Sequence, residues 1–564
     1  MTRSTPSARK SVAQPAVSVP VAAAVRSPGE RRWEAVLTAG YLLWLFLSLV
    51  FPLYDTDFWW HLKTGELILQ RGELPIIDWF TFTDAEQPWI DLHWGFQLLI
   101  TFLYRLGGVN LVILVKAGVI TAAVGVAWFA AGREIPAWLK VPLWGLAVVT
   151  ISGRGYERPE MLSQLFLALW LFVAFRVEKQ PRLIWLLPVI QLVWVNCHAL
   201  FVLGLVVGAA YVIDAVARDF AQGRYGLEIS PLKPTGRAMI RAGGLVALAC
   251  FANPYFEDGA LFPLTLYRKF TVEQDFYSQR IGEFQQPFEF ARRYGFANIY
   301  LLAELGIWLA TAGSFVWLYR QQKRWSVMRF VLFVAFSHLA WEASRNTNIF
   351  SLVAMVILSA NVGDVLRARR LGVAPQTEYR LQWGAAACLV LLVGLVVSGA
   401  WNRLGEGNKP FGLGESEKWF IHDAAKFAGR PDFPQRAFVA NNGQAAVYIY
   451  HNAPERRVFM DGRLEVCTLD TFKVFDGILL MMSQANPAWQ EMFTQGGGEL
   501  PVVILDSRTS RNAINGMINT PGWKLVFADE AGAVFVDNAT ADKLHLEVAD
   551  PTPLKYPPGM KRER

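Results

Sequence analysis

The chain has 564 residues, of which 53% are hydrophobic and only 18% are charged. Soluble proteins carry about 25% charged residues, so the composition excludes a soluble enzyme. The net charge of +7 would suggest nucleic acid for a soluble domain. Here the basic residues gather in short loops between apolar runs, which indicates membrane orientation and no nucleic-acid partner. Four cysteines, three of them in or beside apolar runs, predict no disulfide framework.

The order of the segments predicts a polytopic α-helical membrane protein. Residues 1–32 are rich in Pro, Ser and Ala and predict a disordered cytoplasmic tail. A spanning helix needs about 20 mostly apolar residues. Eleven candidate runs follow, at 33–53, 109–131, 137–153, 159–177, 182–197, 199–217, 238–254, 296–319, 325–341, 346–363 and 382–401. The first run is too long for a signal-peptide core, so we expect about eleven transmembrane helices within 33–401.

The positive-inside rule indicates the orientation of these helices. With the N-terminus in the cytoplasm, the inner loops hold most of the cations of the short loops, including Arg133, Arg176, Lys179, Arg182, Arg320, Lys323 and Arg367. The longer outer loop 255–295 departs from the rule because it holds five basic residues. The rule applies mainly to short loops, so this exception counts less. An odd number of spans then places the C-terminal part outside.

Residues 402–545 differ in pattern from the apolar part. Short β-branched runs at 437–440, 457–460, 501–505, 524–528 and 533–536 alternate with helical patterns. This alternation predicts a soluble extracytoplasmic α/β domain, followed by a tail at 546–564. The domain has no glycine-rich phosphate loop and no serine-nucleophile elbow. We expect it to recognise an acceptor or to cover the active site.

The large outer loop 54–108 holds the most informative polar residues. It opens with Asp55, Asp57, a Trp pair and His61. If this stretch is helical, Asp57 and His61 share one face. A partly desolvated carboxylate there suits a general base or a hard metal ion. The alternative is that Asp55 caps the helix and the Trp pair anchors it at the membrane surface.

Several motifs carry a resemblance to a known superfamily. They are the acidic loop DTDFWWHLKTGELILQRGELPIIDWFTFT with PWIDLHWGFQLL, and the segments 154–171, 194–208, 253–259, 281–287 and 344–359. In type and order they resemble the GT-C membrane glycosyltransferases, the superfamily of protein O-mannosyltransferases and lipid A aminoarabinose transferases. The resemblance is closer to uncharacterised bacterial multi-spanning members and covers most of residues 33–540.

This resemblance implies transfer of a sugar from a polyprenyl-phosphate donor to an acceptor on the outer face of the bacterial cytoplasmic membrane. In that superfamily an acidic residue after the first span takes the proton of the acceptor hydroxyl. The resemblance implies this role for Asp57 or, alternatively, Asp55. The leaving phosphate needs cations, for which we expect Arg154, Arg158, Arg345 and Lys63. Snorkelling to ordinary head groups, or pairing with nearby glutamates, is the alternative for these cations.

The remaining candidates are contacts with donor or acceptor, namely His61, Asp91, His93, Asn196, His198 and Glu283. As an alternative to a binding role, Asn196 and His198 could equally well form hydrogen bonds with the backbone of their turn. The alternative for Glu283 is an acid exposed on a loop without a binding role. Some members of the superfamily use a divalent cation and others do not. If Mg²⁺ or Mn²⁺ binds here, Asp55, Asp57 and Glu283 are the ligands that we expect.

Two other classes of function compete with the transferase. A transporter or flippase of a lipid-linked substrate tends to show internal repeats and broken helices near the midplane. We find no repeat, and the polar residues crowd the outer surface. A non-catalytic scaffold in envelope assembly would not need the acids of the first loop. We therefore predict a glycosyltransferase whose acceptor is an undetermined glycan, lipid or protein.

Overall fold

The computed structural model describes residues 27–225, 236–323, 325–369, 373–403, 409–494 and 498–555. Most of the predicted N-terminal tail, residues 1–26, and the last part of the C-terminal tail, residues 556–564, lie outside the described residues. The first helix begins earlier than its apolar run. Ser27 accepts a hydrogen bond from the backbone of Glu30, whose carboxylate accepts one from the backbone of Ser27. This capping box starts the helix within the segment predicted as tail.

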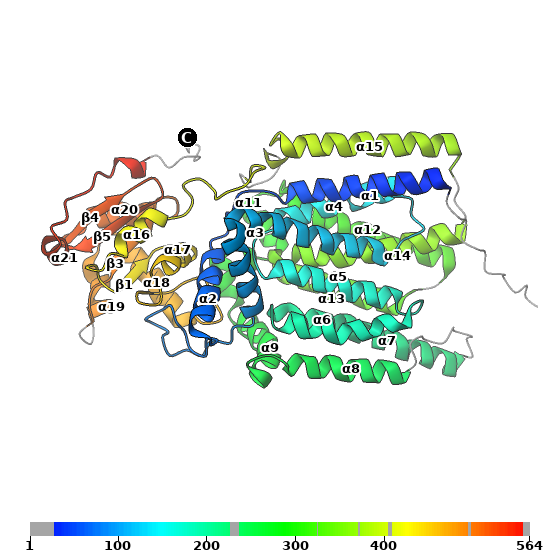
Figure 1. Cartoon of the computed structure of the whole chain (residues 1–564), viewed down its shortest axis with the longest axis horizontal. Coiled ribbons are helices and arrows are strands. Elements are labelled where there is room, and N and C mark those ends of the chain that lie inside the picture. The colour runs from blue at the N-terminus through cyan, green and yellow to red at the C-terminus, as the bar shows by residue number, and fades with distance from the viewer. Residues whose placement is uncertain are drawn as a thin grey trace, which may run out of the picture.

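A bundle of helices forms the first part of the molecule (Figure 1). In the described residues a helix lies at each of the eleven apolar runs: α1 (Pro28–Ser48), α3 (Trp94–Ala130), α4 (Ala137–Gly153), α5 (Glu160–Arg176), α6 (Leu186–Val195) after η1 (Pro181–Trp185), α7 (Val202–Tyr225), α8 (Gly236–Phe251), α12 (Ile299–Gln322), α13 (Val327–Glu342), α14 (Thr347–Arg369) and α15 (Pro375–Val397). Five described helices are long and apolar enough to cross a membrane, or six if α8 and the following α9 (Phe256–Val272) form one bent span. The fold is therefore that of a multi-pass protein, and the count of eleven spans stays a prediction.

Two helices run across the end of the bundle instead of along it. They are α2 (Asp57–Arg71) and the first part of α3, which stand upright at the junction in Figure 1. Within α3 the backbone leaves helical geometry at Gly107 and at Gly108, whose φ is 62°. Glycine adopts this left-handed conformation without steric cost, so the chain can turn there from the bundle end into the bundle.

The C-terminal part contains a five-stranded sheet in the order β2-β1-β3-β5-β4. Its strands are β1 (Arg436–Val439), β2 (Arg457–Val458), β3 (Val502–Asp506), β4 (Trp523–Ala528) and β5 (Gly532–Asp537), within two residues of the predicted runs. β1 pairs in parallel with β2 and β3, and β5 pairs antiparallel with β3 and β4. The accompanying helices are α16 (His422–Ala428), α17 (Asn442–Asn452), α18 (Leu469–Ser483), η6 (Pro487–Gln490), α19 (Glu491–Thr494), α20 (Arg511–Ile518), α21 (Asn538–Lys543) and η7 (Thr552–Lys555).

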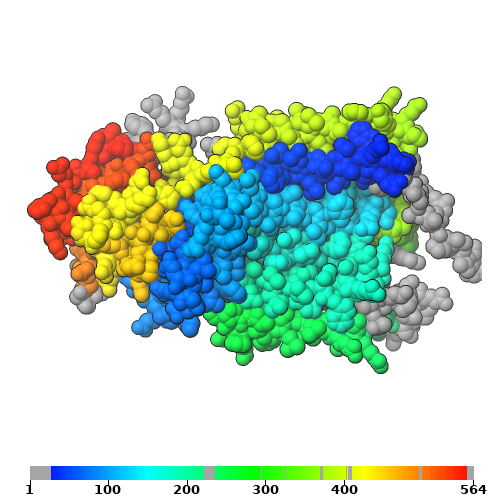
Figure 2. All heavy atoms as spheres, in the orientation of Figure 1, coloured from blue at the N-terminus to red at the C-terminus, as the bar shows by residue number. Residues whose placement is uncertain are grey.

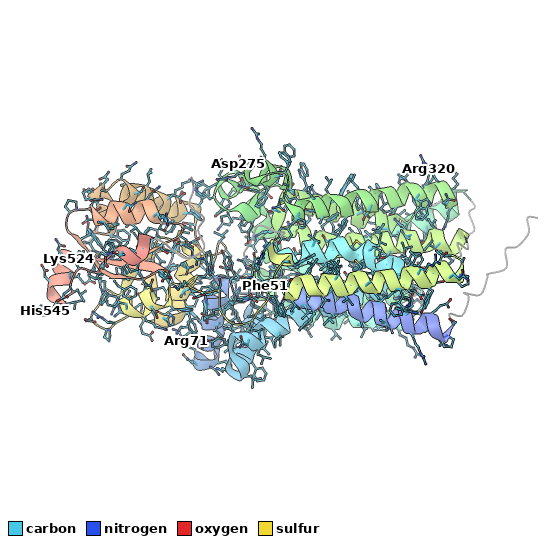
Figure 3. The ribbon with its side chains drawn as sticks, turned by 90° about the horizontal axis from the view of Figure 1, so that it is seen from above. Phe51, Arg71, Asp275, Arg320, Lys524 and His545 are labelled. Carbon is cyan, nitrogen blue, oxygen red and sulfur yellow. The ribbon has the colours of Figure 1, made fainter. Side chains whose placement is uncertain are left out.

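The sheet domain sits against the bundle end opposite to the start of α1 (Figures 1 and 2). Figure 3 shows the same separation, with Phe51 at the junction and Arg320 at the far end. Short elements fill the junction: α9 (Phe256–Val272), α10 (Gln274–Arg280), η2 (Ala199–Phe201), η3 (Gly282–Phe284), α11 (Pro287–Tyr294), η4 (Ser344–Asn346) and η5 (Trp401–Arg403).

Backbone hydrogen bonds tie the domain to residues 54–108, the segment predicted as the first outer loop, and to Leu53 directly before it. The Leu53 N–H donates to the Gly414 carbonyl at 2.8 Å, and the Ser416 N–H donates back to the Leu53 carbonyl at 2.8 Å. On the other side, Thr81 forms a parallel bridge with Val458, so the outer loop covers the β2 edge of the sheet. The segment that carries the candidate carboxylates is therefore held between bundle and domain.

Candidate functional site

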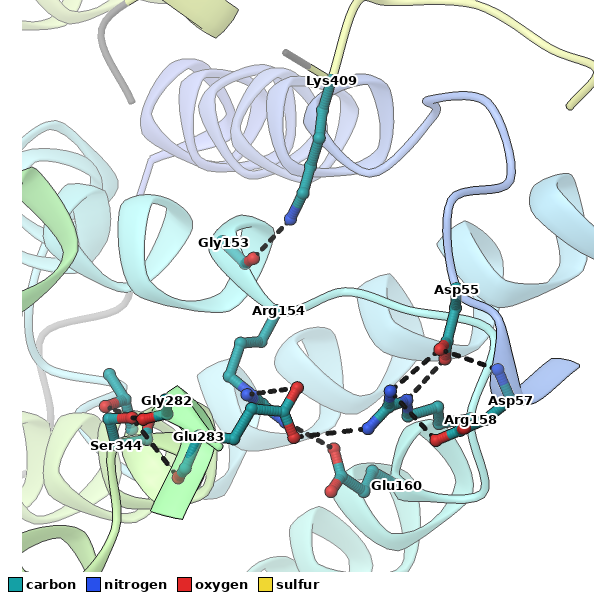
Figure 4. A network of polar contacts seen from close by, with 11 residues as sticks. Asp55, Asp57, Gly153, Arg154, Arg158, Glu160, Gly282, Glu283, Ser344 and Lys409 are labelled. Carbon is teal, nitrogen blue, oxygen red and sulfur yellow. Dashed lines mark hydrogen bonds and ion pairs between the residues drawn. The ribbon is translucent and has the colours of Figure 1, made fainter. Parts of the chain in front are cut away.

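A cluster of carboxylates and guanidinium groups lies at this junction (Figure 4). Arg158, in the loop between α4 and α5, donates from Nε to Asp55 Oδ2 at 2.5 Å and from Nη2 to Asp55 Oδ1 at 2.8 Å. The same guanidinium lies 3.0 Å from Asp57 Oδ2. Asp55 also accepts the backbone N–H of Asp57 at 3.2 Å, a turn that starts α2. Asp55, only 4% exposed, thus positions both Arg158 and Asp57.

Glu283 joins the cluster from residues 255–295, the segment predicted as the second outer loop, where it lies in η3. Its carboxylate forms ion pairs with Arg154 at 3.3 Å and with Arg158 at 3.4 Å. Burial would raise the pKa of Glu283, but the two guanidinium groups hold it well below its ordinary value. Glu283 is therefore an anion throughout the neutral range and not an exposed loop acid.

Asp57 has a different electrostatic environment from its neighbours. Its side chain is 23% exposed, so water or a substrate can reach it. Burial of the surrounding site raises its pKa to about 7; Arg158 opposes this rise, and the negative charges of Asp55 and Glu283 add to it. A carboxylate that exchanges its proton near neutral pH is suited to general-base catalysis.

A cavity of about 1090 Å³ opens between the bundle end and the sheet domain; it is lined by charged, hydroxyl and aromatic side chains and is called the polar cavity below. The bundle side contributes Thr150, Gly153, Arg154, Tyr156, Glu283, Tyr300, Ser344 and Thr347, and the segments on the domain side contribute Tyr54, Lys409, Glu415, Ser416, Glu417, Trp419, Arg508 and Thr509. Lys409 donates to the Gly153 carbonyl at 2.6 Å and lies 4.2 Å above the Tyr156 ring. Sequence reasoning missed Lys409, because a lone Lys–Pro pair in a glycine-rich linker has no recognisable pattern.

A second cavity, of about 380 Å³, is mainly apolar. Side chains of α7, α9 and α13 line it, with Phe284 and Arg345 also in its wall. The Arg345 guanidinium lies 4.2 Å over the Phe284 ring. Because η3 and η4 contribute residues to both cavities, the apolar groove adjoins the polar cavity.

Lys63 is a correction to the predicted phosphate ligands. It follows Asp57 by six residues, which places it about 240° further around the helix. Burial lowers its pKa, and the charges that oppose this shift are those of Glu66 and Glu455. Lys63 lines neither of the two cavities described above. It therefore lies away from the guanidinium groups of the junction.

The stretch is helical as predicted, but Asp57 and His61 do not act together. The His61 ring packs on Trp60 at 3.6 Å and lies near the Gln97 amide at 3.4 Å. Among the described residues, no direct contact joins it to Asp57. The helical periodicity placed both side chains on one side, but His61 is 3% exposed and faces the packed interior between α2 and α3.

The other predicted polar contacts form a group of their own. His93 Nδ1 lies 3.2 Å from Asp91, and His198 Nδ1 lies 2.8 Å from Ser163 Oγ. Asn196 donates to two backbone carbonyls at 2.9 Å, so it satisfies helix and turn backbone. None of these predicted residues lines either cavity. In the described structure they pack the outer loop onto α5 and α6. Asp55, Asp57 and Arg158 likewise line neither cavity, but Arg158 contacts Glu283, which lines the first one.

The predicted metal ligands do not fit a metal ion in their present arrangement. The Arg158 guanidinium lies among Asp55, Asp57 and Glu283, where a shared cation would bind. Within the part of the chain that the structure describes, no three His, Cys, Asp or Glu residues are placed to hold a metal ion. Arg158 supplies the positive charge that these carboxylates need.

Removal of this guanidinium should create a metal site. We expect the Arg158→Ala protein to bind Mn²⁺ through the three released carboxylates, which are ligands of the hard oxygen type. Titration followed by electron paramagnetic resonance should show bound Mn²⁺ in the variant and none in the wild type. Tight Mn²⁺ binding by the wild type would contradict the role given to Arg158.

Comparison with solved structures identifies the fold. The chain is similar to the archaeal oligosaccharyltransferase AglB from Archaeoglobus fulgidus in complex with an inhibitory peptide and a dolichol-phosphate, with TM-score 0.54 and 11% identity over 85% of this chain and 70% of that one. The apo form of the Archaeoglobus fulgidus enzyme gives TM-score 0.53 and 12% identity, over 86% of this chain and 70% of that chain. The arabinofuranosyltransferase AftD from Mycobacteria gives TM-score 0.50 and 14% identity, over 90% of this chain and 40% of that one.

No protein-family model and no curated protein matches the sequence. At these identities the structural likeness defines the fold, which is that of the GT-C membrane glycosyltransferases. The resemblance predicted from the motifs is confirmed at this level.

Proposed function

We propose that the protein transfers a sugar from a polyprenyl-phosphate-linked donor to an acceptor hydroxyl at the outer face of the membrane. The observation that carries this proposal is Asp57, a partly exposed carboxylate with a pKa of about 7, held by Arg158 at the junction of bundle and domain. A polar cavity and an apolar groove meet at the same junction. This arrangement suits one amphipathic donor and one polar acceptor.

The donor would bind across the two cavities. Its lipid chain fits the apolar groove, which has Arg345 in its wall. Its phosphate would lie between Arg345 and the cations of the polar cavity, Arg154 and Lys409. Arginine forks and a lysine ammonium bind phosphate oxygens well, and these groups would stabilise the charge on the leaving phosphate.

The reaction is a single displacement at the anomeric carbon. The acceptor oxygen attacks that carbon while Asp57 takes the hydroxyl proton. The bond from the anomeric carbon to the phosphate oxygen breaks, and the lipid phosphate leaves with the electron pair. Arg158 and Asp55 hold Asp57 in place, and the configuration at the anomeric carbon inverts.

The topology that we propose with this function has eleven spans, a cytoplasmic N-terminus and the sheet domain outside the cell membrane. In support, the start of α1 and the sheet domain lie at opposite ends of the bundle. Arg320, one of the cations predicted to lie in the cytoplasm, is at the end away from the domain (Figure 3). In this topology the cavities open at the outer face of the bacterial cytoplasmic membrane.

The test is donor consumption in proteoliposomes. A panel of radiolabelled polyprenyl-phosphate sugars is offered with a crude envelope extract as the source of acceptor. Wild type should release the lipid phosphate from one donor, and the Asp57→Asn protein should not. Movement of an intact donor across the bilayer without its consumption would instead support a flippase. Binding of a donor without either event would support a scaffold.

The pH dependence of kcat/KM follows from two titrating groups. Asp57 must be ionised to accept a proton, so the rate should rise with pH up to about 7. Burial and the Arg154 charge lower the pKa of Lys409 to about 8, so its cation is lost above that pH. The profile should be a narrow bell. In the Lys409→Arg protein the upper limb should move to higher pH, and an unchanged upper limb would exclude Lys409.

A further inference from the structure

The wall of the polar cavity that faces the sheet domain has its own chemical character. The Tyr54 and Trp419 rings stack with centroids 4.0 Å apart and planes 19° apart. The Arg508 guanidinium lies 4.8 Å over the Trp419 ring and donates to the Lys418 carbonyl at 3.0 Å. Glu417 and Thr509 complete this wall. It therefore combines aromatic surface with a cation, a carboxylate and a hydroxyl.

Two donors on this wall have unused hydrogen-bonding capacity. Arg508 Nε and Trp419 Nε1 are buried, and neither has a hydrogen-bond partner in the described part of the chain. Within the described part of the chain, the Arg508 guanidinium donates to the backbone carbonyls of Glu417 and Lys418. Arg508 Nε and Trp419 Nε1 are both covered by surrounding side chains, so the donor that this wall can offer a ligand is the remainder of the Arg508 guanidinium, which lines the cavity and suits a ligand that brings oxygen atoms.

The ligand that matches these features is a sugar. A pyranose ring offers an apolar face for packing on the part of the Tyr54–Trp419 pair that lines the cavity beside their mutual stacking and Arg508. The hydroxyls at its rim donate to carboxylates and accept from guanidinium groups. A lipid chain fits the second cavity better, because that cavity is the apolar one. An extended peptide would most simply bind as an additional strand at an edge of the sheet. The β2 edge is already covered by Thr81, and no β4 residue lines the cavity.

We infer that Tyr54, Trp419, Glu417 and Arg508 form the binding site for the acceptor and that the acceptor is a saccharide. This inference rests on the proposed function, because it assigns the acceptor of the same reaction. Tyr54 directly precedes Asp55 in the chain. A saccharide on this wall therefore lies in the same cavity as Arg154 and Glu283, next to the carboxylate cluster.

Equilibrium binding tests the inference without turnover. The full-length protein in lipid nanodiscs is exposed to arrays of neutral hexose oligosaccharides, uronic-acid oligosaccharides and Ser/Thr-rich peptides, with no donor present. We expect the wild type to bind an oligosaccharide, with the first two arms separating neutral from acidic acceptors. Trp419→Ala and Arg508→Gln should each weaken this binding about tenfold or more, as the loss of one stacking or charged hydrogen-bond contact does.

Three further variants control for folding. Trp419→Phe keeps an aromatic ring and should restore most of the binding lost in Trp419→Ala. Trp325→Ala and Arg511→Gln change exposed residues outside this wall and should bind like wild type. Binding of peptides alone, no saccharide binding, or equal binding by wild type and both wall variants would overturn the inference. Because no donor is used, this result is independent of whether donor consumption is observed.

Discussion

Replacement of Asp57 by asparagine should lower kcat for sugar transfer by about 10²–10⁴-fold, the range expected for loss of a general base. Asparagine keeps the shape of the side chain but cannot accept the acceptor proton. Partial burial disfavours the charged Asp57 carboxylate, so its replacement by a neutral amide should not lower the melting temperature. In the variant, Arg158 keeps Asp55 and Glu283 as partners. Initial rates in proteoliposomes and thermal melts of the same preparations measure both effects.

Asp55→Asn is the matched control for this prediction. Asp55 accepts two hydrogen bonds from Arg158 and one from the backbone of Asp57. Loss of the Asp55 carboxylate should displace Arg158 and so lower both the rate of transfer and the stability. Because Asp57 is still present, the remaining rate should still rise with pH up to about 7. In Asp57→Asn this rise should be absent. The opposite pattern, in which only Asp55→Asn loses the pH dependence, would make Asp55 the base.

The positions of helices and strands could be predicted because their signals are local. Apolar runs of sufficient length mark the bundle helices, and short β-branched runs mark the strands to within two residues. The boundaries that shifted depend on single features. The capping box of Ser27 and Glu30 lengthened α1. The non-helical backbone at Gly107 and Gly108 separates the part of α3 that crosses the bundle end from the part inside the bundle.

Pairings between distant residues could not be predicted from such local patterns. Asp55 and Arg158 were singled out separately, as base and phosphate ligand, although they are partners across 103 residues. Two charged residues within apolar runs, Lys116 and Glu304, are a further example, because nothing in the local sequence names the partner of either. Lys116 pairs with Glu157 at 3.0 Å, and Glu304 accepts a hydrogen bond from Thr347. Only the packing of the helices decides which charges meet.

A second pairing of this kind leads to the largest expected effect on stability. Arg463 in the sheet domain is 1% exposed. Its guanidinium binds Asp461 at 2.7 Å and Asp78 of the first outer loop at 2.6 Å. Arg463→Met would leave two buried carboxylates without their cation, and loss of one partner from a buried ion pair costs about 3–5 kcal/mol. Thermal unfolding in nanodiscs should show a clear fall in melting temperature.

The same variant should also lose most of its transferase activity, because the Arg463 turn packs on the proposed base. A Cβ atom on Gly462 would lie 2.9 Å from Asp57 Oδ1, so this turn and the carboxylate are in close contact. Asp78→Asn, which keeps the Arg463–Asp461 pair, should fall between Arg463→Met and wild type in both measurements. Arg511→Met, at an exposed position, controls for the loss of a surface arginine. If Arg463→Met lost stability but kept its activity below the melting temperature, the domain would anchor the outer loop without shaping the environment of Asp57.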